Sequence, residues 1–135
     1  MKYLKPLKRK YHLLLILIVF FTWLIFYLIG LPSDYFMQYN QAEKILISLV
    51  GLFAAVPYIS LLTITLIPEK PFKTAMWLTL YASILPFLLD YIVVGIYFKT
   101  GWGFLSSHWY LTIGYNTVWV IIPPIGLAIE KIKTK

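Results

Sequence analysis

The sequence predicts an all-α integral membrane protein: an up-down bundle of four transmembrane helices with both termini in the cytoplasm. Hydrophobic residues make up 61% of the 135 residues and charged residues only 13%, whereas about a quarter of the residues in soluble domains are charged. Four apolar runs approach or exceed the roughly 20 residues needed to cross a bilayer core. The basic residues are distributed unevenly between the two ends of these runs.

The four runs form a single predicted domain, residues 1–135. The expected helices cover residues 12–30, 45–67, 74–98 and 108–129. Their connections are short, so consecutive helices become antiparallel neighbours. The first run follows the basic stretch MKYLKPLKRK, as a signal peptide would. It is longer than a signal h-region, however, and lacks an A-x-A-like cleavage site. We therefore expect it to remain as a mature helix.

The connections contain residues that stop helices. Between the second and third runs, PEKPFK has two prolines, which end one helix and delay the next. The first connection, LPSDYFMQYNQAEK, begins with turn residues. Its YFMQY stretch, residues 35–39, is typical of an aromatic segment at the membrane surface. The third connection, KTGWGFLSSH, is short and adds further aromatic residues.

Ten of the twelve basic residues are predicted to lie on one side of the membrane. Cytoplasmic loops are enriched in Lys and Arg, so this side is predicted to be cytoplasmic. The membrane is predicted to be a plasma membrane. The bias also explains the net charge of +7 without a nucleic-acid partner, which we do not expect. The ten are Lys2, Lys5, Lys8, Arg9, Lys10, Lys70, Lys73, Lys131, Lys133 and Lys135, against Lys44 and Lys99 on the other side.

Small and polar residues mark the surfaces through which membrane helices associate, because packing and hydrogen bonds drive that association. The last three helices each have such a stripe, whereas the first is almost uniformly aliphatic and aromatic. We therefore expect the first helix to be the most exposed to lipid. The stripes include, in helix order, Ser48 and Tyr58, Ser83 and Asp90, and Asn116 and Trp119.

Three polar residues share one predicted depth. Asp90, Asn116 and Thr22 each lie eight residues from the non-cytoplasmic end of their predicted helices. At about 1.5 Å of rise per residue, each lies roughly 12 Å below that end. This alignment predicts one polar cluster that joins three helices.

Asp90, in the stretch ILPFLLDYIV, has two interpretations. A charged side chain at the bilayer centre costs about 2.5 to 3.5 kcal/mol, and intramembrane acids by default indicate function. Asp90 would then be a proton carrier or the counter-ion of a cationic or polar ligand. The alternative is a hydrogen-bonded structural residue that joins its helix to Asn116 or Tyr115. The candidate ligand- or proton-binding residues are Asp90, Asn116, Thr22, Tyr58, Ser83 and Trp119.

Three functions follow from this site. The leading hypothesis is a small membrane protein that binds or translocates a small molecule or ion. A homodimer, the commonest symmetric oligomer, would supply a second Asp90. The alternative is a non-catalytic accessory subunit that binds a partner in a larger membrane complex. A lipid-modifying enzyme with Asp90 as acid or base is a third hypothesis, but it lacks a second catalytic group.

Known catalytic and metal-binding patterns are absent from the sequence. There is no cysteine, and we find no G-x-S-x-G, no H-E-x-x-H and no Gly-rich phosphate loop. His12 and His108 fall at opposite membrane faces, so they cannot share a metal ion. No cofactor is therefore expected. The chain resembles small multidrug exporters in size and four-helix layout. Those proteins depend on a glutamate in the first helix, which residues 12–30 lack, so we carry no site over.

Overall fold

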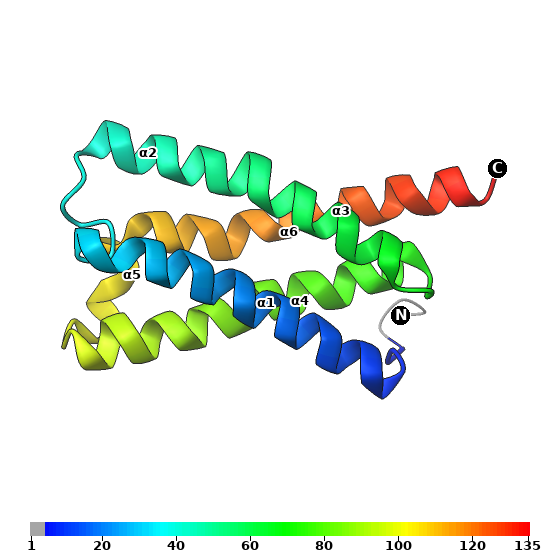
Figure 1. Cartoon of the computed structure of the whole chain (residues 1–135), viewed down its shortest axis with the longest axis horizontal. Coiled ribbons are helices and arrows are strands. Elements are labelled where there is room, and N and C mark those ends of the chain that lie inside the picture. The colour runs from blue at the N-terminus through cyan, green and yellow to red at the C-terminus, as the bar shows by residue number, and fades with distance from the viewer. Residues whose placement is uncertain (1–4) are drawn as a thin grey trace.

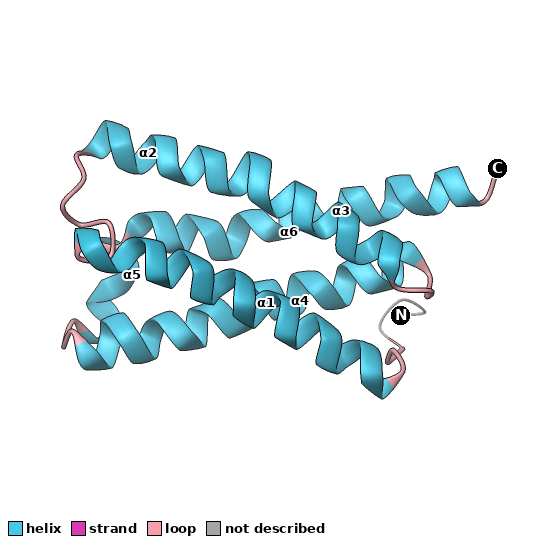
Figure 2. Ribbon diagram, viewed as in Figure 1, coloured by secondary structure: helices cyan, strands magenta, loops and turns pink. Residues whose placement is uncertain are grey.

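The computed structural model describes residues 5–135, so Lys2 of the basic set lies outside the described residues. Within that range the chain consists of helices and loops (Figures 1 and 2). The elements in chain order are α1 (Arg9–Gly30), η2 (Leu31–Ser33), α2 (Gln41–Val50), η3 (Gly51–Ala55), α3 (Val56–Leu66), α4 (Pro71–Asp90), η4 (Tyr91–Tyr97), η5 (Gly101–Gly103), α5 (Phe104–Ser107) and α6 (Trp109–Lys133).

Four stretches of helix are long and apolar enough to cross a membrane, which confirms an all-helical chain with four candidate spans. Their bounds are Arg9–Ser33, Gln41–Leu66, Pro71–Tyr97 and Trp109–Lys133. The first three spans begin three or four residues earlier than predicted, and the first and fourth end later. The second span begins early because of a capping box. Asn40 Oδ1 accepts from the Glu43 amide, and Glu43 Oε2 accepts from the Asn40 amide, each at 2.9 Å.

Two spans change from α- to π-helical geometry near a proline. The five-residue η3 precedes Pro57, and the seven-residue η4 follows α4, which contains Pro86. A proline has no amide N–H, so it leaves a carbonyl in the preceding turn without its usual donor. A wider π turn is one way for a helix to accommodate this interruption.

The helices pack most closely around α4 and α6. A Cβ added at Gly126 would lie 2.3 Å from the Ala75 Cβ and 3.0 Å from the Pro71 carbonyl oxygen, so α6 approaches α4 where only glycine fits. The main core lies around this approach. Its buried residues are Leu7, Leu15, Val19, Ile64, Ile67, Ala75, Leu78, Val118, Ile122 and Ile129.

The second span is the most exposed of the four. The expectation that the first helix is the most exposed to lipid is therefore wrong. Only 6% of the residues in its most apolar stretch are buried, against 17% to 22% in the other three spans. The reason is packing: α1 packs on α4, whereas α2 and α3 pack mainly on α6 and have little contact with α1. In Figure 1, α2 diverges from α1 towards one end of the bundle.

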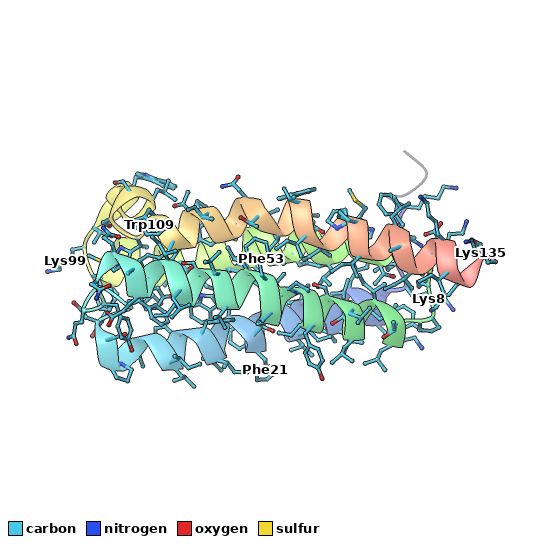
Figure 3. The ribbon with its side chains drawn as sticks, turned by 90° about the horizontal axis from the view of Figure 1, so that it is seen from above. Lys8, Phe21, Phe53, Lys99, Trp109 and Lys135 are labelled. Atoms are coloured by element: carbon cyan, nitrogen blue, oxygen red, sulfur yellow. The ribbon has the colours of Figure 1, made fainter. Side chains whose placement is uncertain are left out.

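The two ends of the bundle carry different connections. Residues 31–40 and 98–108 lie at one end, which we call the loop end. The turn after α3 and the C-terminus lie at the other, which we call the terminal end. Lys8 and Lys135 lie at the terminal end and Lys99 at the loop end (Figure 3). Large apolar side chains such as Phe21 and Phe53 are exposed on the outside, at 55% and 64%.

Candidate functional site

Asp90, the last residue of α4, is 2% exposed and accepts three hydrogen bonds. Its Oδ1 accepts from Trp23 Nε1 at 2.7 Å and from the Tyr35 hydroxyl, and its Oδ2 accepts from the Tyr115 hydroxyl. These four residues form what we call the Asp90 cluster. The cluster joins α1, the first connection, α4 and α6. Asp90 is the acceptor in all three bonds.

Aromatic packing orients two of the donors. Trp23 stacks on Tyr27 one helical turn later, with ring centroids 5.1 Å apart and planes at 11°. Tyr115 meets the ring of Phe87 edge-on at 5.6 Å. Edge-to-face and offset-stacked arrangements are the favoured geometries of aromatic pairs. The donors are therefore held in place by side chains from their own or the neighbouring helix.

Tyr35 reaches Asp90 because the first connection folds back into the bundle. Asp34, Tyr35 and Phe36 have φ angles of 52°, 55° and 67°, a left-handed run without glycine. Such conformations cost about 1 to 2 kcal/mol per residue. Contacts that the run makes offset this cost: the Tyr35 amide donates to the Gly30 carbonyl at 2.8 Å, and the Tyr110 hydroxyl donates to the Tyr35 carbonyl.

The YFMQY stretch divides between the interior of the bundle and its surface. Tyr35 and Phe36 are 3% and 7% exposed, whereas Met37 and Tyr39 are 40% and 38% exposed. The Phe36 ring can pack closely against the end of α1 because Gly30 has no side chain. A Cβ added at Gly30 would lie 2.8 Å from the Phe36 ring.

The charge states at the loop end follow from burial. Burial, and next the nearby Asp90 carboxylate, raise the pKa of the Tyr35 phenol well above its usual value, so Tyr35 keeps the proton that it donates. His108 is buried beside the rings of Tyr35 and Tyr110, and its Nδ1 lies 2.9 Å from Ser107 Oγ. Burial lowers the pKa of His108, as does Lys44, while Asp34 partly opposes the shift.

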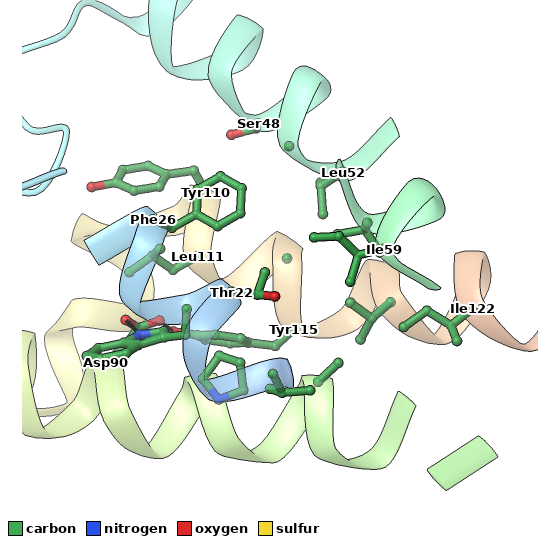
Figure 4. A pocket seen from close by; sticks show the side chains of 18 of the residues that line it. Thr22, Phe26, Ser48, Leu52, Ile59, Asp90, Tyr110, Leu111, Tyr115 and Ile122 are labelled. Atoms are coloured by element: carbon green, nitrogen blue, oxygen red, sulfur yellow. Dashed lines mark hydrogen bonds between the residues drawn. The ribbon is translucent and has the colours of Figure 1, made fainter. Parts of the chain in front are cut away.

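A cavity of about 220 Å³ extends from the Asp90 cluster between α1 and the α2–α3 span, with α4 and α6 behind it. In Figure 4, Thr22 and Phe26 come from α1, Ser48 and Leu52 from the second span, and Asp90 from α4. Most lining side chains are apolar. The cavity is open to the outside of the bundle, where the second span diverges from α1.

Two polar side chains of the wall, Thr22 and Ser48, are hydrogen-bonded within the protein. The Thr22 hydroxyl donates to the Ile18 carbonyl and the Ser48 hydroxyl to the Lys44 carbonyl, both at 2.8 Å. Each bond stays within its own helix. The cavity therefore offers a guest mainly hydrocarbon surface, with the hydroxyl-rich Asp90 cluster at one end.

The structure brings together some of the predicted site residues and separates others. Asp90 and Thr22 line the same cavity. Ser83 and Asn116 line a second hollow between α4 and α6. Tyr58 and Trp119 are 64% and 43% exposed and line neither hollow.

The partner of Asp90 on α6 is Tyr115. Asn116, one residue further, donates from Nδ2 to the Thr112 carbonyl at 2.9 Å, so the alternative pairing of Asp90 with Asn116 is wrong. Depth along the helices put Asn116 at the level of Asp90, and the neighbouring Tyr115 does reach Asp90. Depth says nothing, however, about how α6 is rotated about its own axis. Adjacent helical residues point about 100° apart, so only one of them can face Asp90.

Sequence reasoning missed Trp23, Tyr35 and Tyr110 as site residues. Trp23 adjoins Thr22, so the depth argument could have found its indole N–H. Tyr35 and Tyr110 had no local signal, because their roles depend on the fold of the first connection. No group of three or more His, Asp or Glu side chains that could hold a metal ion occurs in the described part of the chain.

Comparison with known proteins adds no site residues. No protein-family model, curated protein or solved structure matches this chain. The chemistry of the site therefore has to be argued from the geometry of the cavity and the Asp90 cluster.

Proposed function

We propose that this protein is a multi-pass membrane protein that binds one apolar chain of a lipid or lipid-like molecule in the cavity between α1 and the second span. The observation that supports this most directly is an apolar cavity open to the outside of the bundle and closed at one end by the Asp90 cluster. Binding pockets are mostly apolar, with a few polar groups that fix orientation.

The chemistry of the wall favours an apolar guest over an ion. A bare ion in a low-dielectric site needs several oxygen or charged ligands to replace its water. The hydroxyls of Thr22 and Ser48 are bonded to their own helices, and Asp90 already accepts from three donors. Asp90 therefore acts as a positioning residue that holds the cavity end together, and not as a mobile proton carrier.

The length of the cavity matches one leaflet. Along α6 its wall extends from Tyr110 to Ile122, roughly 18 Å at 1.5 Å per residue. The hydrocarbon core of a bilayer is about 30 Å thick, so the cavity covers roughly one half of it. A chain from the leaflet at the loop end could enter sideways without crossing the membrane.

The side on which this leaflet lies depends on topology. The excess of Lys and Arg at the terminal end supports a cytoplasmic location for both termini, and this would place the cavity in the outer leaflet. The native chain has no cysteine. In sealed cells an impermeant thiol reagent should therefore label Ser106→Cys and not Thr134→Cys. The opposite labelling would move the cavity to the cytoplasmic leaflet.

The binding proposal is tested by filling the cavity. Ser48 lines it, whereas the next residue, Leu49, is 48% exposed on the outside. Ser48→Phe should occupy the space that a chain would take, and Leu49→Phe is its matched control. We expect lipid to remain bound to the purified wild type and to Leu49→Phe in native mass spectrometry, and to be lost from Ser48→Phe.

Two results would contradict the binding proposal. One is equal lipid retention by the two phenylalanine variants. The other is a protein partner present at fixed stoichiometry, with no bound lipid in any variant, which would support the accessory-subunit hypothesis instead. Matching thermal stability of the two variants would show that Ser48→Phe had not simply unfolded.

A further inference from the structure

The hollow between α4 and α6 contains polar groups without partners. Its volume is about 290 Å³, and Ser83 of α4 and Asn116 of α6 line it. Asn116 is exposed and makes one hydrogen bond, from Nδ2 to the Thr112 carbonyl. Neither its carboxamide oxygen nor the Ser83 hydroxyl has a hydrogen-bond partner among residues 5–135. Ser83 lies near the middle of the span Pro71–Tyr97.

These groups need a partner because of where they lie. Lipid chains neither donate nor accept hydrogen bonds, and a polar group left unpaired in hydrocarbon is costly. Side chains such as Asn and Ser reduce this cost by bonding across helices. The bundle itself supplies no such bond to Asn116 beyond its own helix.

We propose that this hollow is the interface of a symmetric homodimer, in which the Asn116 carboxamides of two copies bond to each other. A carboxamide has both a donor and an acceptor. About a two-fold axis each Asn116 can therefore donate to its twin and accept from it, which fits the isologous contacts of closed dimers. A different protein would need a complementary group at the same depth, whereas a second copy always has one.

The surroundings of the hollow suit a second copy. Residues 74–89 of α4 and 109–129 of α6 contain no charged side chain, so two copies would meet without like-charge repulsion. Large apolar side chains on the same two helices are exposed and available for packing: Ile84, Leu88, Ile113 and Val120. This proposal does not rest on the lipid-binding proposal, which concerns the space between α1 and the second span.

Dimerisation can be measured on the full chain in lipid vesicles. Energy transfer between copies that carry donor and acceptor dyes is followed while the ratio of lipid to protein is raised. Loss of two reciprocal hydrogen bonds, each about 0.6 kcal/mol in membranes, should weaken the dimer roughly tenfold. We expect this for Asn116→Leu. Thr117→Val is the matched control, because the Thr117 hydroxyl already bonds to the Ile113 carbonyl of its own helix at 2.7 Å.

A second experiment locates the interface and does not depend on Asn116→Leu folding normally. In the cysteine-free chain, Ile113→Cys should form a disulfide-linked dimer on mild oxidation, and Phe53→Cys on η3 should not. The proposal is overturned by a wild type that stays monomeric at every dilution. It is also overturned by equal dimerisation of Asn116→Leu and wild type, or by cross-linking through Phe53→Cys in place of Ile113→Cys.

Discussion

The two ends of the bundle both have buried apolar residues, with Tyr35, Val94 and Phe104 forming a second core at the loop end, but they differ in how closely their helices approach. At the terminal end, Gly126 lets α6 approach α4 closely, and an apolar core fills the space. At the loop end, the second span diverges and α1, α4 and α6 are joined through hydrogen bonds to one buried carboxylate, Asp90. The loop end therefore keeps a cavity that the terminal end has no room for.

This contrast suggests how a small bundle can hold a guest without losing its shape. Apolar packing is non-directional and closes any space that side chains can fill. Hydrogen bonds fix a few atoms at set distances, and at the loop end they hold three helices together beside a cavity. Substitutions at one end at a time can separate the two contributions.

The largest effect should come from the glycine contact at the terminal end. In Gly126→Ala the new Cβ would meet Ala75 and the α4 backbone, so α6 must move. We expect the free energy of unfolding to fall by about 3 kcal/mol, at the upper end for overpacked sites. Gly114→Ala is the control because a Cβ there meets nothing within 4 Å. It should stabilise the protein or leave it unchanged, and equal losses for both variants would contradict this account.

At the loop end, the form of the substitution at Asp90 should matter. Asp90→Leu removes the acceptor of three donors, and at about 0.6 kcal/mol per bond we expect a loss of roughly 2 kcal/mol. Asp90→Asn keeps one oxygen for Trp23 and Tyr35, and its amino group can donate to the Tyr115 oxygen. It should therefore lose much less stability. Thermal unfolding of both variants tests this, and equal losses would show that the bonds to Asp90 contribute little.

One substitution at the terminal end should stabilise the protein. Thr74 is fully buried, and among the described residues its hydroxyl has no hydrogen-bond partner. Thr74→Val replaces that hydroxyl with a methyl group of similar shape, so we expect a gain of about 1 kcal/mol. Thr79→Val is the comparison, because the equally buried Thr79 hydroxyl donates to the Ala75 carbonyl at 2.8 Å. A greater gain at Thr79 would argue against this explanation.

The smallest effect should be a pH dependence at the loop end. Burial and Lys44 lower the folded-state pKa of His108 from its ordinary value of 6.5, so the unfolded chain takes up this proton more readily. The contribution of neutral His108 to the free energy of unfolding is fully present above about pH 6.5. It is lost as the pH falls towards the lowered pKa of His108. Wild type should melt at a lower temperature at pH 5 than at pH 7.5, and His108→Gln should show a smaller difference. An unchanged difference in His108→Gln would exclude His108 as the cause.

Much of the fold, but less of the site, followed from the sequence. Apolar run length and composition were sufficient to predict four helices, because a bilayer sets the length that a span needs. They did not predict the early start of α2, which depends on bonds between Asn40 and Glu43. The N-x-x-E spacing was a usable signal for that start.

That Asp90 would be buried with hydrogen-bond partners was predictable from its apolar surroundings, but most of those partners were not. Depth along a helix follows from counting residues, whereas rotation about the helix axis depends on packing, which is why Asn116 was proposed beside Tyr115. Tyr35 could not be predicted from local pattern. Its left-handed run opposes backbone preference, and contacts with Gly30, Asp90 and Tyr110 in the folded chain offset part of that cost.

Trp23 offers the most direct test of the central claim that an apolar chain occupies the cavity, because its indole lies in the cavity wall. The other four tryptophans can be replaced by phenylalanine, and the protein placed in vesicles whose lipid chains carry bromine, a contact quencher of indole fluorescence. We predict strong quenching of Trp23 that falls sharply in Ser48→Phe and persists in Leu49→Phe. Weak quenching in all three proteins, or quenching that Ser48→Phe leaves unchanged, would contradict the claim.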